Sequence, residues 1–321
     1  MDLIYTDTNH NDVGVLKDYT FDLAYGSDEN DFELVLDLNH HCCEPGCLIY
    51  IEGTEYGGII DTINVVTKDN KLSYKGRTWH GVLASKIIEP PEGYAYAIHA
   101  GDANAVIHGV IERIGLLDLF DVSSEDSGMR IKDYAFDRYV DAYSGINKML
   151  TTVSGKLKFT FTNDKVVISA VPIVDYSKDE RFDNDQIGMQ IEKAYNSVNH
   201  LICLGKGELT NRQVVHLYRD AQGSVSKTQT FFGLQEVVEV LDYPNAESTD
   251  ELIKSGTQRL QEFNVNDKVQ LDFTSEETIY DVGDIVGAME IVTGIIVNKK
   301  INKKVVTINQ GLVNIQYKVG E

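Results

Sequence analysis

The residues best suited to hold a metal ion form the run His40-His41-Cys42-Cys43-Glu44-Pro45-Gly46-Cys47. Two thiolates and an imidazole would supply most of a four-ligand structural zinc site. Neighbouring residues of an extended strand point to opposite faces, however, so adjacent cysteines or adjacent histidines are poorly placed to share one ion. No second pair of cysteines or histidines follows at zinc-finger or zinc-ribbon spacing. We therefore predict a turn whose cysteines act as small apolar residues, and no metal site.

Three polar loops have some features of ligand sites. Gly205-Lys206-Gly207-Glu208 contains two glycines of a nucleotide-binding loop, but position 210 is not a third glycine, and no helix is expected to begin there. We predict a β-turn at this point. Asp28-Glu29-Asn30-Asp31 and Asp183-Asn184-Asp185 carry oxygen atoms that suit calcium, but neither has the spacing of an EF-hand loop. Both are predicted to be solvated surface loops.

The sequence shows no catalytic constellation. It contains no Gly-x-Ser-x-Gly, no His-Glu-x-x-His and no papain-like cysteine segment. Five histidines occur singly in segments predicted to be structured, and we expect them to be hydrogen-bonded packing residues rather than bases: His80, His99, His108, His200 and His216. We predict no catalytic, cofactor-binding or metal-binding residues, no cofactor, and a protein that is not an enzyme.

Composition limits the classes of partner. The 321-residue chain has a formal net charge of −21, which disfavours a surface that grips nucleic acid or an anionic membrane. An acidic surface still suits a conduit through which DNA passes without sticking. Three of the four cysteines lie within six residues, unlike a secreted disulfide framework, so synthesis in a reducing cytosol is expected. The N-terminus lacks a signal-peptide pattern, and no apolar run reaches the ~18 residues of a membrane span.

A pattern that occurs twice is the strongest architectural signal. Residues 46–76 contain glycines that delimit apolar segments at spacings of 12 and 18 residues, and residues 283–311 repeat the pattern at spacings of 11 and 17. Internal self-similarity favours duplication, and two copies are too few for a solenoid. We predict two related β-domains. The alternative is that two unrelated antiparallel meanders share glycine-bounded apolar triplets.

Residues 1–90 are predicted to form the first β-barrel. Apolar and polar residues alternate over 19–25 and again over 32–38, with a loop of hairpin length between them. Pro90-Pro91 ends the sheet, because neither residue has an N–H to donate. Trp79, the only tryptophan, is predicted to anchor the interface between this domain and the next, since its large ring is best used in packing.

Residues 91–175 are predicted to form a small α+β insert domain. Asp102 is placed to cap a helix whose apolar residues recur at i, i+3, i+4 and i+7. A second helix is predicted for about 144–153. Two apolar strands follow, joined by a tight turn at Asn163-Asp164.

Residues 176–321 are predicted to form the second β-barrel, with a helix at about 248–263. The polar segment 176–190 reads as a connector. Ser248 and Glu251 have the spacing of a capping box at the start of the helix. The predicted fold class is therefore α+β and mainly β: two related β-barrel domains, a small α/β insert and one extra helix.

Segments from both halves of the chain carry a family resemblance when they are taken together. In the first half they are Trp79-His80-Gly81-Val82-Leu83, Ile87-Ile88-Glu89-Pro90-Pro91 and Gly101-Asp102-Ala103-Asn104. In the second half they are Gly205-Lys206-Gly207-Glu208-Leu209-Thr210, Arg212, Val215-His216-Leu217-Tyr218, Asp220, Gly223 and Val282-Gly283-Asp284-Ile285-Val286-Gly287. In order and spacing these segments resemble the hub proteins of siphophage and prophage tails, over nearly the whole chain.

The resemblance implies a definite assembly. Two tube-like β-barrel domains per chain, in a homotrimer, would give six barrels in a pseudo-sixfold ring. Such a ring joins the sixfold tail tube and distal tail ring to a threefold tip. The implied function is a structural baseplate hub at the tip of a siphovirus or prophage tail of a Gram-positive host. DNA and the tape-measure protein would pass through it without specific binding.

The resemblance also implies partners and a location. The partners are the distal tail protein, the tape-measure protein, and tip, fibre or receptor-binding proteins, without membrane insertion by this chain. The location is the tail tip of the virion, after assembly in the bacterial cytoplasm. The sequence ends at Gly320-Glu321 directly after its last predicted strand, so host contact and wall cleavage are expected of other polypeptides. The alternatives are a tail-associated peptidoglycan endopeptidase, a cell-wall carbohydrate-binding module, and the hub of a tail-like bacteriocin.

Overall fold

The chain is organised in two compact units. The computed structural model describes the chain except residues 179–180, 184–187, 193–196, 222, 247, 264–267, 275–278 and 321. The first unit comprises Met1–Met189 with Leu271–Gly320, and the second comprises Gln190–Gln270. The predicted domain boundaries after residues 90 and 175 stay predictions.

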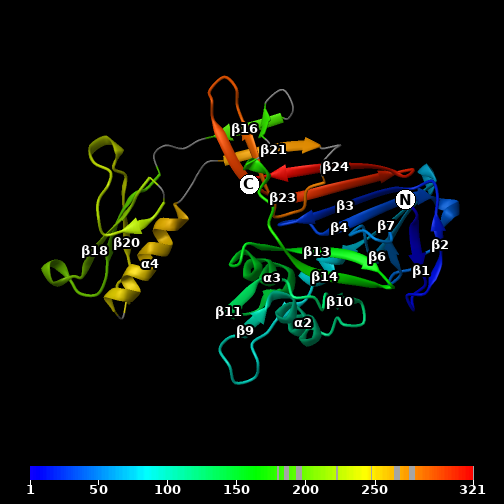
Figure 1. Cartoon of the computed structure of the whole chain (residues 1–321), viewed down its shortest axis with the longest axis horizontal. Coiled ribbons are helices and arrows are strands. Elements are labelled where there is room, and N and C mark those ends of the chain that lie inside the picture. Colours follow the sequence, from blue (N-terminus) through cyan, green and yellow to red (C-terminus); the bar gives the residue numbers. More distant parts are fainter. Residues whose placement is uncertain are drawn as a thin grey trace. The chain divides into compact units, whose positions relative to one another are not determined.

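A thirteen-stranded sheet is the largest element of the fold (Figure 1). Its main path runs β16-β21-β24-β23-β3-β4-β7-β6-β5-β1-β2, while β22 pairs with β23 and β15 pairs with β22. The strands are β1 Leu3–Thr6, β2 Asp12–Leu16, β3 Thr20–Gly26, β4 Asp31–Asp37, β5 Leu48–Tyr50, β6 Gly57–Val66, β7 Lys71–Thr78, β15 Arg181–Asp183, β16 Gly188–Glu192, β21 Lys268–Thr274, β22 Ile285–Met289, β23 Ile296–Asn309 and β24 Leu312–Val319.

The alternation seen in the sequence gives this sheet one apolar and one polar face. In β3, Phe21 and Tyr25 are fully buried, while Asp22 between them is only half-buried. The β4 strand alternates in the same way, and its Phe32 meets Phe21 edge-on at 5.5 Å between ring centroids. Side chains of period two on paired strands therefore collect the aromatic residues on one side of the sheet.

An α/β insert follows β7 and packs on the apolar face. It contains α1 Trp79–Ala84, β8 Ile87–Ile88, β9 Ile98–Asp102, α2 Ala103–Arg113, β10 Phe120–Val122, β11 Arg130–Ala135, β12 Val140–Asp141, α3 Ala142–Thr151, β13 Gly155–Thr162 and β14 Lys165–Pro172. The carboxylate of Asp102 accepts from the N–H of Asn104 at 3.0 Å, which confirms the predicted cap. Trp79 is fully buried and stacks on Phe161 of β13 at 5.6 Å, so the predicted anchor is confirmed as well.

The second unit is a small sheet with one helix on it. The sheet order is β19 Val225–Ser226, β18 Val214–Arg219, β17 His200–Leu204 and β20 Val238–Asp242, and the helix is α4 Thr249–Glu262. The N–H of Glu251 donates to Ser248 Oγ at 3.1 Å, as predicted. Gly256 lets the helix approach the sheet closely, because a Cβ there would lie 2.4 Å from Cys203 Sγ.

The structure bears on two expectations about architecture. The fold is mainly β, as predicted, but among the described strands no pairing closes a barrel, because the β23–β3 pair joins both halves into one open sheet. The two barrels therefore stay a prediction. The connector predicted at 176–190 is wrong, since the segment contains β15 and the first residues of β16. None of the described helices is long and apolar enough to cross a membrane.

Candidate assembly interface

One four-strand order occurs twice along the large sheet. The path contains β16-β21-β24-β23 and then β3-β4-β7-β6. In each group the fourth strand also pairs with the short strand that precedes it in the chain, β22 with β23 and β5 with β6. We name β3–β7 the first repeat and β16 with β21–β24 the second repeat. The equal order indicates two copies of one structural unit.

The backbone at Gly46 and Gly283 identifies equivalent positions in the two repeats. Each glycine donates its N–H to an isoleucine carbonyl, Gly46 to Ile60 at 2.8 Å and Gly283 to Ile301 at 2.9 Å. Each isoleucine N–H donates back to the residue after the glycine, at 2.9 and 2.8 Å. The φ angles of the glycines are +96° and +99°, a region that favours glycine. A shift in register follows each isoleucine.

The other two glycine correspondences predicted from sequence are wrong. Gly58 and Gly76 lie inside paired strands, where a Cβ on Gly76 would lie 1.9 Å from the Ile59 carbonyl oxygen. Gly294 and Gly311 lie in turns. The spacing coincided because turn glycines and close-approach glycines look alike in a sequence.

The two repeats meet at an antiparallel pair, β23 with β3. The register sets Val306 opposite Leu23 and Thr307 opposite Asp22. On the polar face the Thr307 hydroxyl donates to the Asp22 carboxylate at 2.6 Å. On the apolar face Val306 is fully buried. The fourth strand of one repeat is thus completed by the first strand of the other.

The fourth strand of the first repeat is an incomplete edge. Residues 62–66 of β6 pair with β7, and within the described strands nothing pairs with their other side. Counting from the shared register shift, Val65 of β6 corresponds to Val306 of β23. Val65 is 49% exposed, whereas Val306 is 0% exposed. An apolar residue that the neighbouring strand covers in one repeat is therefore uncovered in the other.

The polar face of the sheet carries charges of both signs. A shallow hollow of about 670 Å³ on this face is lined by the charged residues Asp22, Glu29, Asp31, Glu33, Asp61, Lys75, Arg77, Lys303 and Lys318. Lys75 pairs with Glu33 at 3.3 Å, and Arg77 pairs with Asp61 at 2.7 Å. The acidic excess of the chain is thus nearly balanced here, unlike the acidic conduit suggested by composition.

Buried ion pairs tie the insert and both repeats together. Lys304 of the second repeat, 1% exposed, donates to Glu55 of the first repeat at 2.7 Å. Lys156 of the insert donates to Asp281 and Asp284 at 2.8 Å. Burial alone would lower the pKa of Lys304, yet the Glu55 carboxylate leaves it above the usual range. Burial alone would raise the pKa of Asp281, but its bond from Lys156 lowers it overall.

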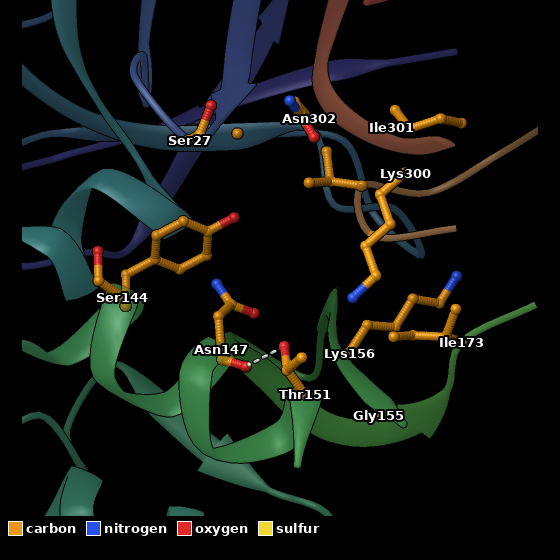
Figure 2. Close-up of a pocket in the computed structure, with 14 residues that line it drawn as sticks. Ser27, Ser144, Asn147, Thr151, Gly155, Lys156, Ile173, Lys300, Ile301 and Asn302 are labelled. Atoms are coloured by element: carbon orange, nitrogen blue, oxygen red, sulfur yellow. Dashed lines mark hydrogen bonds between the residues drawn. The ribbon is translucent and has the colours of Figure 1, made fainter. Parts of the chain in front are cut away.

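A hollow of about 360 Å³ lies where the insert meets both repeats. Figure 2 shows Asn147 and Thr151 of α3 on one side, with Lys300 and Asn302 of β23 facing them across the space. Gly26 and Ser27 at the end of β3 complete the wall. The amine of Lys156 in this wall is already held by two carboxylates, so the hollow is a junction of three elements rather than an anion site.

The buried His80 predicts a pH-dependent stability. Burial, together with the charge of Lys304, lowers the pKa of His80 to about 3. The unfolded chain takes up this proton below about pH 6.5, whereas the folded chain does so only near pH 3. We expect the free energy of unfolding to fall on acidification by about 1.4 kcal/mol per pH unit within this window.

Denaturant unfolding between pH 7 and 4 measures this effect. His80→Phe keeps an aromatic ring beside Tyr25, on which His80 stacks at 4.7 Å, and should lose this part of the slope. His108→Phe, on an exposed position of α2, is the control and should keep it. Equal pH dependence in the native chain and His80→Phe would contradict the assignment.

The His/Cys run predicted as a turn is a loop without a preformed metal site. Among the residues described, no group of three or more His, Cys, Asp or Glu side chains is arranged to hold a metal ion. Cys42 and Cys43 do not point to opposite faces as expected, because residues 41–44 are not in a strand. Their sulfur atoms lie 3.5 Å from each other. His41 Nδ1 is hydrogen-bonded with the Tyr74 hydroxyl at 2.9 Å.

The predicted loops lie where the sequence placed them. Residues 205–213 form the connection between β17 and β18, where the N–H of Gln213 donates to the Lys206 carbonyl at 2.9 Å. Residues 206–207 form a bend, followed by a short 3-10 helix at Leu209–Asn211, so the β-turn stays a prediction. Residues 27–30 connect β3 to β4, while Asp31 is the first residue of β4, and Glu29 pairs with Lys303. Asp183 ends β15, while Asn184 and Asp185 lie outside the described residues.

The histidines behave in different ways. His200 and His216 lie on paired strands and contact one another, with 2.8 Å between Nε2 and Nδ1, and His200 Nδ1 is 2.6 Å from Glu236 Oε1. The prediction of single histidines missed this pair, because strand pairing is not visible in a sequence. His80 packs as predicted, although its buried Nδ1 has no hydrogen-bond partner. His108 is exposed rather than packed.

Comparison with known proteins places the fold. No family profile and no curated protein sequence matches the chain. A tail protein from Neisseria meningitidis MC58 matches over 100% of this chain and 96% of its own, with TM-score 0.53 and 12% identity. Prophage tail protein gp18 from Listeria monocytogenes EGD-e matches over 100% and 94%, with TM-score 0.56 and 10% identity.

A third solved structure agrees with these two. The 43 kDa tail protein of prophage MuSo2 from Shewanella oneidensis matches over 99% of this chain and 98% of its own, with TM-score 0.55 and 10% identity. The chain therefore has the fold of phage and prophage tail proteins. Because the three structures come from three bacterial genera, the likeness does not single out a host.

Proposed function

We propose that the chain is a structural hub of a phage or prophage tail, in which three copies form a ring. The observation that carries this proposal is the repeated four-strand unit with one incomplete edge. Two repeats in each of three chains give six similar units. The likeness to tail proteins over the full length of the chain supports the same role.

Ring closure would repeat a contact already present within the chain. The β23 strand of the second repeat is completed by β3, the first strand of the first repeat. In the equivalent contact between copies, the free edge of β6 would lie beside β16, which is the first strand of the neighbour's second repeat. Such a head-to-tail contact closes into a ring when the rotation allows. It would cover Val65 as Val306 is covered, and it would pair the free edges of β6 and β16.

The polar face of the sheet would line the central channel. The apolar face is covered by the insert in each chain, so the polar face is the side left for water and passing molecules. Its ion pairs, such as Lys75 with Glu33, leave few unpaired cations to grip phosphate. DNA and the tape-measure protein would therefore pass without specific binding.

The remaining parts of the proposal rest on the family resemblance. The partners are the distal tail protein, the tape-measure protein and tip, fibre or receptor-binding proteins. The location is the tail tip of a virion that infects a Gram-positive host and is assembled in the bacterial cytoplasm. The role is structural and not enzymatic.

Light scattering over a range of protein and salt concentrations tests the ring. We expect a mass three times the 35.9 kDa of the chain, with ring-shaped particles in negative-stain images of the same fractions. Salt should favour the trimer, because screening weakens repulsion between chains of net charge −21. A monomeric mass under every condition, also after mixing with the distal tail protein, would contradict the proposal.

Zymography on Gram-positive cell walls separates the hub from the endopeptidase alternative. A structural protein should leave the walls intact, whereas clearing would favour the enzyme. Binding of purified wall glycans by a monomeric chain would favour the carbohydrate-binding module.

A further inference from the structure

The loop before β5 holds two adjacent thiols face to face. The Sγ atoms of Cys42 and Cys43 are 3.5 Å apart, and both cysteines are free. Cys42 is half-buried, while Cys43 is only 1% exposed. One thiol can therefore be reached from solvent, and the other lies in contact with it on the protein side.

Tyr74 fixes the backbone of this pair. Its hydroxyl oxygen accepts from the N–H of Cys42 at 3.0 Å and from the N–H of Cys43 at 3.2 Å. The same hydroxyl is hydrogen-bonded with His41 Nδ1 at 2.9 Å, and Tyr74 is fully buried in β7. The loop conformation that brings the two sulfurs together is thus anchored to the core.

We propose that Cys42 and Cys43 form a redox-active dithiol, which a small disulfide such as oxidised glutathione converts into a disulfide between these neighbouring residues. The Cys42 thiolate attacks one sulfur of oxidised glutathione, whose S–S bond breaks and releases one glutathione thiolate. Cys43 loses its proton to solvent and attacks Sγ of Cys42, which releases the second glutathione. The protein loses two electrons and two protons, and one oxidised glutathione becomes two reduced molecules.

The surroundings of the two thiols favour Cys42 as the thiol that attacks first and Cys43 as the thiol that resolves the adduct. The thiolate is the attacking form of a cysteine. The hydrogen bond from Cys43 lowers the pKa of Cys42, which favours its thiolate. The bond with Cys42, together with burial, raises the pKa of Cys43. Cys42 is therefore the first attacker, and Cys43 reacts only after Cys42 carries glutathione.

The resulting disulfide would be easy to reduce. The Cα atoms of neighbouring residues are about 3.8 Å apart across a trans peptide, below the usual disulfide range of about 4.4–6.8 Å. A strained disulfide has a higher reduction potential and belongs to the labile class. The pair should therefore be reduced in a glutathione-buffered cytosol and oxidised outside it.

Mass spectrometry of the native full-length chain tests the proposal. The reduced protein is incubated with oxidised glutathione at neutral pH, quenched with acid and alkylated. We expect the loss of two hydrogens without a retained glutathione, with a peptide map that places the bond between Cys42 and Cys43. Dithiothreitol should restore both thiols.

Single substitutions separate the two steps. Cys43→Ser should accumulate a stable glutathione adduct on Cys42, because nothing resolves it, whereas Cys42→Ser should react slowly or not at all. Cys203→Ser, in the buried core of the second unit, should behave as the native chain does. Circular dichroism checks that each variant is folded. A persistent adduct on the native chain, a bond that involves Cys47, or no reaction would overturn the proposal.

Discussion

Val65→Asp is expected to abolish the trimer. In a closed ring Val65 would take the place that Val306 has within the chain, where the exposed fraction is 0% rather than 49%. A carboxylate in that position would be buried without a partner at each of the interfaces, at a cost of several kcal/mol each. In the free chain the same carboxylate stays in water, so folding should lose only about 1 kcal/mol, the span of strand propensities.

Light scattering and thermal unfolding of the same samples distinguish these effects. Val65→Asp should give a monomeric mass at concentrations where the native chain is trimeric, with a nearly unchanged monomer fold. Val65→Thr, which keeps the branched shape, should still assemble. Val292→Asp is the matched control, because Val292 is 88% exposed in the turn before β23. A trimer of Val65→Asp at native affinity would mean that β6 is not the contact edge.

Lys304→Met is expected to destabilise the fold by about 3–5 kcal/mol, the usual cost of breaking a buried ion pair. Lys304 is 1% exposed, and its amine is the hydrogen-bond donor to Glu55. Methionine fills a similar volume, so little of the loss would come from packing. The loss comes instead from the Glu55 carboxylate, which is 18% exposed and would be left in the protein without its cation.

A double substitution tests this explanation. Lys304→Met with Glu55→Gln removes both charges, and it should be more stable than Lys304→Met alone. Lys318→Met, at an exposed position of the adjacent β24, should change the unfolding midpoint little. The measurement is the free energy of unfolding in denaturant. If the single and double variants are equally destabilised, the cost lies in packing rather than in the unpaired carboxylate.

Local features of the fold could be predicted from the sequence because they depend on neighbouring residues. The alternation over 19–25 and 32–38 predicted the β3–β4 hairpin. Asp102 and Ser248 predicted two helix starts, since a capping side chain acts within three residues.

Features that depend on distant residues could not be predicted. The pairing of β3 with β23 joins segments from opposite ends of the chain into one sheet. The stretch 176–190 is too polar to predict strands from its own residues. Its strands form by pairing with β21 and β22, which lie far along the sequence.

The candidate interface could not be predicted from the sequence either, because it also depends on distant residues. Val65 reads as an ordinary strand residue, and only comparison with Val306 shows that it is uncovered. The contact between Cys42 and Cys43 was excluded by a rule for strands that does not hold in their loop.

The position of the second unit has a practical consequence for protein engineering. In the second repeat, a whole folded unit separates β16 from β21 along the chain, whereas the equivalent strands β3 and β4 are joined by the short turn 27–30. The same hairpin thus exists once with a short turn and once with a folded insertion. Exposed turns are the usual sites of tolerated domain insertion. The 27–30 turn is accordingly the place to graft a foreign domain.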